Sequence, residues 1–253
     1  MKFGILTMSR GDSKRLEHWI RYHDSIGFTD YFIILDNPND DSEAILEKLS
    51  DEFNINVFVK APSGPYYDDV CSSELWNIKK KWLADNKNII DEMNFPINDE
   101  ISFRQYKYFP EIMKRIENNN LVDWLSIIDV DEYIDLIGYE DIAEMVSEVG
   151  GERIRLLNFN YDTSSSFPIV KPVTETATFR WDRQDIIEFG SGWEYRCKSI
   201  VKYDKALPLV SVHAISKGSF KVVEHTKAKL NHYKYPIMNN IPYTVDDPLK
   251  FNK

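Results

Sequence analysis

Cysteine is scarce in this chain, which has 253 residues and only Cys71 and Cys197. Two cysteines so far apart supply neither the disulfide framework of a small secreted domain nor the paired spacing of a zinc site. A single bridge between them is one interpretation, and two reduced thiols are the other. We favour the reduced thiols and therefore expect a cytoplasmic protein.

Long apolar runs are missing as well. The N-terminal stretch begins with a short apolar run that charged residues follow at once, unlike a secretory signal. No window approaches the ~18 consecutive apolar residues that a membrane span needs. We expect a protein without a transmembrane segment, in which any contact with a membrane is peripheral.

Positive charge is in deficit, with 31 Lys and Arg against 41 Asp and Glu and a formal net charge of −10. General binding to nucleic acids is therefore not expected, because a phosphate backbone is bound mainly by clustered Lys and Arg. Hydrophobic residues make up 43% of the chain and charged residues 28%. These fractions are those of an ordinary globular protein and exclude a disordered chain.

Strand and helix patterns alternate over the first 160 residues. The predicted strands cover residues 3–8, 31–35, 57–59, 124–131 and 153–159, and the predicted helices cover residues 16–27, 42–52, 73–83, 104–118 and 139–149. Residues 61–103 are interpreted as an insertion that carries one of these helices. Beyond Asp162 we expect short β-like pieces and one helix near Val173 to Trp181.

The alternation predicts one α/β domain with a mostly parallel sheet flanked by helices and a smaller β-rich region. We divide it into residues 1–135, residues 136–238 and a tail at 239–253. In such sheets ligands bind beyond the carboxyl ends of the strands. The first candidates are therefore the strand ends, at residues 7–10, 36–37, 129–132 and 160–162.

The sequence Asp129-Val-Asp131-Glu132 follows the most apolar of these strands. If the strand continues, Asp129 and Asp131 share one face, where their like charges need a cation between them. Mg²⁺ or Mn²⁺ binds such carboxylates together with substrate phosphates. An acidic turn without a ligand is the structural alternative. A phosphatase or phosphotransferase with Asp129 as nucleophile is the alternative chemistry.

Other polar residues allow two interpretations each. Asp36 either accepts hydrogen bonds from a base or ribose or forms a turn with Asn37, and Arg10 either meets a phosphate or lies on the surface. His213 and His232 are either metal ligands or buried residues, whereas His23 is expected in the core. The aromatic residues of the insertion form either an acceptor platform or part of a helical cover; they are Tyr66, Tyr67, Trp76 and Trp82.

The order of several motifs resembles that of family-two-like glycosyltransferases with a GT-A fold, including their family 92 relatives. The motifs are Leu16–Gly27, Tyr31–Asn37, Gln105 with Tyr108, Trp124–Tyr133, Lys198–Val201, His213 and Leu230–Tyr233. The likeness spans residues 1–235, and its specificity lies in the combined order. The usual Asn-Glu after the first strand reads Gly11-Asp12 here.

The resemblance implies a metal-dependent transferase that moves a sugar from a nucleotide-sugar, expected to be a UDP-sugar, to a glycan or glycolipid. The implied donor-binding residues are Thr7, Arg10, Asp36, Asn37, Gln105 and Asp129. The implied ligands of Mn²⁺ or Mg²⁺ are Asp129, Asp131 and His213, with His232 as second choice.

Transfer with inversion requires a carboxylate base, because the acceptor hydroxyl must lose its proton. The candidates are Asp162, Glu175, Asp182 and Asp185, with Asp162 preferred. A domain that binds nucleotide-sugars without catalysis is the remaining alternative. The resemblance further implies a role in the synthesis of surface polysaccharide or glycoconjugate.

Overall fold

The computed structural model describes residues 1–63, 65–66, 72–190, 192–203, 209–213, 218–234 and 241–251. In this part of the chain a nine-stranded sheet has the order β3-β2-β1-β4-β8-β6-β10-β5, with β9 beside β6. Its strands are β1 (Phe3–Ser9), β2 (Asp30–Asp36), β3 (Asn54–Lys60), β4 (Trp124–Ile127), β5 (Glu132–Asp135), β6 (Arg153–Asn160), β8 (Cys197–Lys202), β9 (Lys221–Val222) and β10 (Lys229–His232). A second sheet pairs β7 (Phe179–Trp181) with β11 (Tyr243–Asp246).

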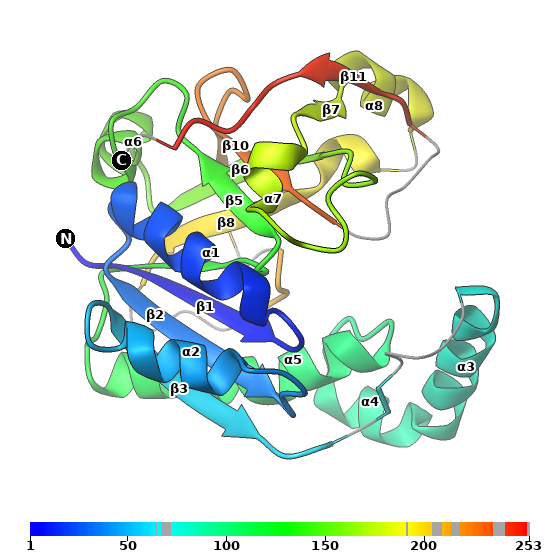
Figure 1. Ribbon diagram of the computed structural model, residues 1–253. Helices are drawn as coiled ribbons and strands as arrows, with labels where there is room; N and C mark the ends of the chain where they lie inside the picture. The colour runs from blue at the N-terminus through cyan, green and yellow to red at the C-terminus, as the bar shows by residue number, and fades with distance from the viewer. Residues whose placement is uncertain are drawn as a thin grey trace.

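Helices cover both faces of the large sheet (Figure 1). They are α1 (Ser13–Ser25), α2 (Ser42–Leu49), α3 (Ser72–Asp85), α4 (Lys87–Met93), α5 (Glu100–Asn118), α6 (Ile142–Val149), α7 (Val173–Thr176) and α8 (Arg183–Phe189), with a 3₁₀ turn at Trp193–Tyr195. The predicted fold class, an α/β sheet flanked by helices with a smaller β-rich region, is confirmed. No helix in the described ranges is long and apolar enough to cross a bilayer.

The half of the sheet formed by β3, β2, β1 and β4 is entirely parallel. Alternate residues of β2 contribute to two separate cores: Tyr31, Ile33 and Leu35 pack under α1, α2 and α6, while Phe32 and Ile34 pack under α5. Both faces of β1 and β2 are buried, which is why these two strands read as continuous apolar runs, whereas the edge strand β3 is only partly buried. Because the four strands run the same way, their carboxyl ends share one edge of the sheet.

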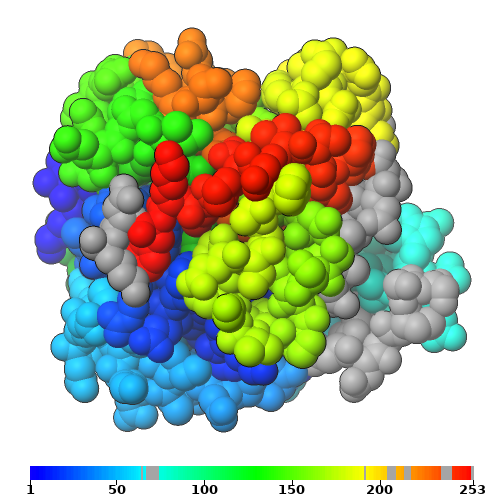
Figure 2. Space-filling view, turned by 45° about the horizontal axis from the view of Figure 1, so that its top comes forward, coloured from blue at the N-terminus to red at the C-terminus, as the bar shows by residue number. Residues whose placement is uncertain are grey.

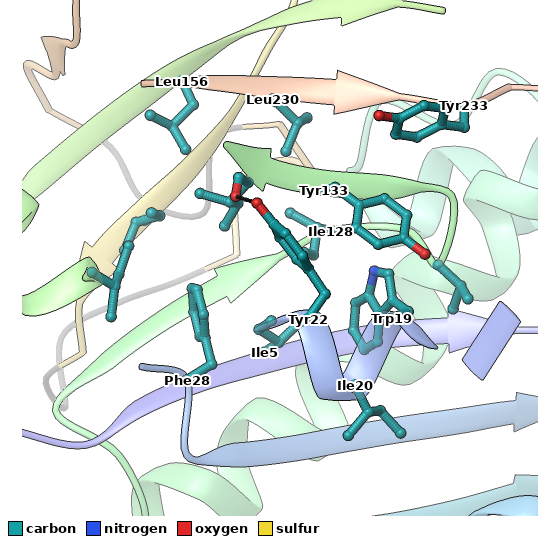
Figure 3. Close-up of a cluster of buried hydrophobic side chains, with 14 of the residues drawn as sticks. Ile5, Trp19, Ile20, Tyr22, Phe28, Ile128, Tyr133, Leu156, Leu230 and Tyr233 are labelled. Carbon is teal, nitrogen blue, oxygen red and sulfur yellow. Dashed lines mark hydrogen bonds between the residues drawn. The ribbon is translucent and has the colours of Figure 1, made fainter. Parts of the chain in front are cut away.

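An aromatic cluster joins α1 to the strand that follows the acidic turn (Figure 3). The indole N–H of Trp19 donates to the carbonyl oxygen of Glu132 at 2.9 Å, and the hydroxyl of Tyr22 donates to that of Ile134 at 2.8 Å. The rings of Tyr22 and Tyr133 pack edge to face. These bonds fix β5, and with it the end of the Asp129–Asp131 segment.

His23 belongs to the same cluster and is fully buried, so the prediction of a core histidine is confirmed. Its Nδ1 lies 2.9 Å from the carbonyl oxygen of Trp19, and its Nε2 lies 3.4 Å from the amide nitrogen of Ile134. A neutral ring satisfies both contacts, with Nδ1–H donating and Nε2 accepting. Burial lowers the pKa of His23 to about 3.

The prediction of one helix near Val173 to Trp181 is wrong. The segment forms the single turn α7, which ends at Thr176, and then the strand β7. Alternate threonines have low helix propensity, and pairing with β11 stabilises the extended form. A further helix, α8, begins only after Asp182, whose carboxylate accepts a hydrogen bond from the amide of Gln184.

The prediction of a tail at residues 239–253 is wrong for residues 241–251, because these residues pack on the domain. The strand β11 pairs with β7, and the C-terminal segment lies across the surface of the later half of the chain (Figure 2). Asp247 binds Arg180 and Lys229, and the ring of Phe251 contacts His18 and Tyr22. The sequence signal was weak because residues of β11 are at most half-buried.

The insertion at 61–103 carries two helices, α3 and α4, where one was predicted. Both project beside the first turns of α5 (Figure 1). Trp76 is 63% exposed, and Trp82 packs edge to face on Phe103. Cys71 and Tyr67 lie outside the described residues, and Cys197 is a buried free thiol.

Candidate functional site

A cavity of about 530 Å³ lies at the carboxyl edge of the parallel strands. The segment after β1 forms one wall with Ser9 and Arg10, and the Asp129–Asp131 segment forms another. Arg104 and Gln105 of α5 close the opposite side. His232, at the end of β10, lines the same cavity although it lies a hundred residues further along the chain. Three of the four predicted strand ends, at residues 7–10, 36–37 and 129–132, therefore contribute to one hollow, whereas residues 160–162 do not line it.

The acidic motif forms a turn, and the strand that was expected to reach Asp131 is shorter. The strand β4 ends at Ile127, and the amide of Glu132 donates to the carbonyl oxygen of Asp129 at 3.0 Å. Asp129 and Asp131 are thus not two positions on one strand face. Both still line the cavity, because the turn directs them to the same edge of the sheet.

A buried lysine neutralises the first of these aspartates. Lys198 on β8 is 3% exposed, and its Nζ lies 3.0 Å from Asp129 and 3.2 Å from Glu132. Burial alone would lower the pKa of Lys198, but the two carboxylates outweigh burial and raise it. The ammonium group is therefore charged, as a buried ion pair of this kind requires.

The second aspartate contacts a histidine. The Oδ2 atom of Asp131 lies 3.4 Å from Nε2 of His232, and both side chains are largely buried. Burial would raise the pKa of Asp131, but His232 outweighs burial and holds the pKa below its usual range. In return, Asp131 raises the pKa of His232 against the effect of burial.

His213, the preferred metal ligand of the sequence analysis, lies in a different setting. Its Nδ1 is 3.2 Å from the carbonyl oxygen of Cys197, and it lines a neighbouring cavity of about 540 Å³. Asp129 and His232 line that cavity as well. The geometry favours His232, because its Nε2 lies 3.4 Å from Oδ2 of Asp131.

Asp36 is almost fully buried at the end of β2, and both of its oxygens are engaged. Oδ2 accepts a hydrogen bond from Nε of Arg104 at 2.5 Å, and Oδ1 accepts one from the hydroxyl of Tyr66 at 2.8 Å. The Tyr66 ring lies between two guanidinium groups, 4.0 Å from that of Arg10 and 4.4 Å from that of Arg104. A ring in this place is favoured by cation–π attraction.

The remaining predicted residues are distributed unevenly around the cavity. Gln105 lines it, while Thr7 is fully buried within β1 and Asn37 follows β2 with a positive φ of 49°. Asp162 lies after β6, where its Oδ1 accepts a hydrogen bond from the amide of Ser164 at 2.9 Å. Glu175 is exposed on α7. Neither Asp162 nor Glu175 lines this cavity.

The cavity offers a divalent metal ion few protein ligands. Within the described ranges no cluster of three His, Cys, Asp or Glu side chains is close enough to hold an ion alone. Asp131 and His232 face the same cavity, and a hard cation commonly takes one or two carboxylates plus substrate phosphates. These residues fit an ion that shares its ligands with a bound diphosphate, and they do not fit a closed protein cage.

Sequence reasoning missed the roles of three cationic residues. Lys198 was seen only as part of a motif, although a lysine within the apolar run Cys197–Val201 signals a buried partner. The sequence pattern indicates Arg104 only as the start of a helix, and none of the motifs includes Arg15. Arg104 contacts Asp36, and Arg15 lies 3.5 Å from Asp12 on the cavity wall.

Comparison with known proteins gives one close relative in sequence. The chain is 40% identical over 246 residues to a glycosyltransferase family 92 protein of Ricinus communis. The alignment covers 92% of this chain but only 35% of the relative, so the chain spans about a third of that protein's length. No family model matches the sequence.

Two solved structures show weaker likeness. Residues 1–349 of TarS from S. aureus share 12% identity at a TM-score of 0.44, covering 92% of this chain and 60% of that one. The mannosyltransferase Ktr4p from S. cerevisiae, solved with GDP, shares 12% identity at a TM-score of 0.36, covering 79% of this chain and 56% of that one. Scores this low carry no argument about the site. The sequence relationship is what confirms the resemblance seen in the motifs: over 92% of its length, this chain is a homologue of a glycosyltransferase family 92 protein.

Proposed function

We propose that this chain transfers a sugar from a nucleotide-sugar donor to a hydroxyl group of a glycan or glycolipid. The observation that carries the proposal is the convergence of Arg10, the Asp129–Asp131 turn, Arg104 and His232 on one cavity at the carboxyl edge of a parallel sheet. Ligands of α/β sheets bind at this edge. The homology to a family 92 glycosyltransferase supports the same reaction class.

Opposite charges in the cavity suit a nucleotide diphosphate. Arg10, Arg15 and Lys234 line it and supply cations for phosphate oxygens. Asp131 and His232 are the residues that would hold a Mn²⁺ or Mg²⁺ ion, and such an ion would neutralise charge on the leaving diphosphate. The donor in this proposal is a UDP-sugar, and the anomeric carbon is inverted.

The Tyr66 ring gives the base-binding end of the cavity a specific form. It is held by two guanidinium groups and by the carboxylate of Asp36. A nucleobase is also a flat ring that stacks on guanidinium groups. We propose that the base either stacks on this assembly or takes the place of Tyr66, which would free one oxygen of Asp36.

The alternative chemistry, a phosphatase with Asp129 as nucleophile, has less support. The Oδ2 atom of Asp129 is ion-paired with Lys198, and the pair is held by a third group, Glu132. A carboxylate engaged in this way is a weaker nucleophile than a free one. Detection of a covalent aspartyl-phosphate by mass spectrometry would favour this alternative over glycosyl transfer.

Calorimetric titration with UDP and with GDP, each with and without Mn²⁺, tests the proposal. We expect one nucleotide to bind and its affinity to fall when Mn²⁺ is withdrawn or when Asp131→Asn is introduced. Lys202→Met serves as a control, because Lys202 is exposed at the far end of β8. If neither UDP nor GDP binds, with or without Mn²⁺, the proposed function is contradicted.

A further inference from the structure

Among the described residues, five carboxylates line the main cavity, and each of them has a partner nearby. Asp36 binds Arg104 and Tyr66. Asp129 is paired with Lys198, and Asp131 contacts His232. Glu100 is fully buried, 3.6 Å from Nζ of Lys79. The fifth, Asp12, contacts Ser9 and Arg15, and among these five acids it alone also lines the hollow bounded by Phe167, Pro168 and Ile169.

Asp12 lies between the end of β1 and the start of α1. Its side chain is 21% exposed, its Oδ2 accepts a hydrogen bond from the hydroxyl of Ser9 at 3.0 Å, and its Oδ1 lies 3.5 Å from Arg15. Burial, with a smaller contribution from Asp131, raises the pKa of Asp12 to about 6 although Arg15 opposes the shift. A carboxylate with such a pKa is ionised at neutral pH and more basic than an ordinary aspartate.

A second cavity, of about 410 Å³, lies on the other side of this residue. Asp12 and Arg15 line both cavities, so the two hollows share one wall. The far side of the second cavity is formed by Phe167, Pro168 and Ile169, and polar groups come from Ser13, Asn39 and Asp40. The cavity thus has one apolar side opposite mainly polar and charged residues, and an amphipathic small ligand can contact both. A sugar ring, with its apolar face and hydroxyl edge, matches that composition.

We propose that the second cavity binds the acceptor sugar and that Asp12, in the shared wall, is the catalytic base. This inference rests on the proposed function. The carboxylate of Asp12 takes the proton of the acceptor hydroxyl while that oxygen forms a bond to the anomeric carbon of the donor sugar. The bond between the anomeric carbon and the diphosphate oxygen breaks, and its electron pair leaves with the nucleoside diphosphate.

The proposal replaces Asp162 and Glu175 as candidates for the base. Asp162 is engaged with the amide of Ser164, and Glu175 is exposed on α7. Neither lines the main cavity or the second one.

The first experiment compares Asp12→Asn with Asp24→Asn, the same change at an exposed position on α1. Transfer is measured from UDP-glucose, UDP-galactose, UDP-N-acetylglucosamine and GDP-mannose to p-nitrophenyl glycosides, with donor hydrolysis as the readout where no glycoside reacts. We expect kcat to fall at least about 100-fold for Asp12→Asn, as loss of a general base does. Affinity for UDP should be equal or greater, because a negative charge is removed, and Asp24→Asn should match the wild type.

Retention of kcat by Asp12→Asn would overturn the assignment of the base. Loss of kcat in Asp162→Asn, with Asp12→Asn active, would return the role to Asp162. A wild-type protein that binds neither UDP nor GDP would instead contradict the proposed function itself. If Asp12→Asn lowered the affinity for UDP by the same factor as kcat, Asp12 would have a structural role, and this result would also overturn the inference.

The second experiment tests the cavity without requiring turnover. Saturation-transfer NMR with methyl glycosides, recorded in the presence of UDP, reports whether a sugar contacts the protein. We expect a signal with the wild type that Phe167→Ala abolishes while UDP affinity stays within about twofold, a difference below 1 kcal/mol. Absence of the signal in a wild type that binds UDP, or an undiminished signal in Phe167→Ala, would overturn the acceptor site.

Discussion

The two halves of the large sheet differ in strand direction and in what they contribute to the cavity. The strands β3, β2, β1 and β4 are parallel and bring carboxylates to one edge, at Asp36, Asp129 and Asp131. The strands β8, β6, β10 and β5 are mixed in direction and bring the partners of two of those acids, Lys198 and His232.

The comparison shows that the acidic motif is completed by residues from the other half of the sheet. An Asp-x-Asp turn by itself gathers negative charge and would repel a diphosphate. Lys198 from β8 neutralises Asp129, and His232 from β10 contacts Asp131. The site therefore depends on correct pairing of the mixed half, and substitutions there should affect it as strongly as substitutions in the motif.

The largest expected effect comes from removing the buried ammonium group. Lys198→Met leaves Asp129 and Glu132 without their cation, and breaking a buried ion pair costs about 3–5 kcal/mol. Lys202→Met, four residues along the same strand, removes an ammonium group that is 54% exposed and should cost about 1 kcal/mol at most. Urea denaturation followed by circular dichroism measures both.

A double variant separates the charge effect from loss of packing. In Lys198→Met with Glu132→Gln, one of the uncompensated charges is gone, so part of the lost free energy of unfolding should return. Equal stability of Lys198→Met and Lys202→Met would show that the mixed half does not supply an essential cation.

The next effect is a pH dependence that originates in the core under α1. His23 has a pKa of about 3 in the folded protein and about 6.5 when unfolded, so the unfolded state binds a proton that the folded state rejects. The resulting loss of stability begins below pH 6.5 and continues to about pH 3. Between pH 7 and pH 5 it amounts to about 2 kcal/mol.

The variant His23→Gln should lower the free energy of unfolding at pH 7 but flatten its decline toward pH 5. His225→Gln, at a half-buried site, should flatten it less. Urea denaturation at pH 7, 6 and 5 provides the comparison. An unchanged slope in His23→Gln would mean that the histidine is not buried in its neutral form.

The smallest effect is expected at an exposed ion pair of the parallel half. Arg21 on α1 binds both oxygens of Glu52, at 2.7 and 2.9 Å, with both side chains well exposed. Because water and salt screen such charges, Glu52→Gln should lower the free energy of unfolding far less than Lys198→Met does. Thermal unfolding at low and high salt measures this loss of stability. If Glu52→Gln destabilised the protein as much as Lys198→Met does, the contrast between the two halves would disappear.

Much of the parallel half could be predicted from the sequence because its signals are local. Continuous apolar runs mark β1 and β2, and Gly27 ends α1 at a φ of +98°, where a side chain would be strained. The acidic turn follows an apolar strand, so its place at the edge of the sheet was also readable. The length of that strand was not, because apolar residues continue through Ile128 and Val130 into the turn.

The mixed half and its contribution to the site were harder to predict because they depend on contacts distant in sequence. The pairing of Lys198 with Asp129 spans 69 residues, and although a lysine in an apolar strand signals a buried partner, nothing local identifies Asp129 as that partner. The choice between His213 and His232 depended on the register of β10 against β5, which places His232 opposite Glu132. The second cavity joins residues 11–15 to 167–169, a combination that no sequence window contains.

The central claim is that the mixed half completes the acidic motif through His232, and one titration tests it most directly. Calorimetry with UDP in the presence of Mn²⁺ is carried out on the wild type, His232→Gln and His213→Gln. We expect His232→Gln to weaken Mn²⁺-dependent binding of UDP at least about tenfold, the range found for groups that hold or orient metal ligands. A smaller loss is expected for His213→Gln, and the opposite order would show that His232 does not complete the acidic motif.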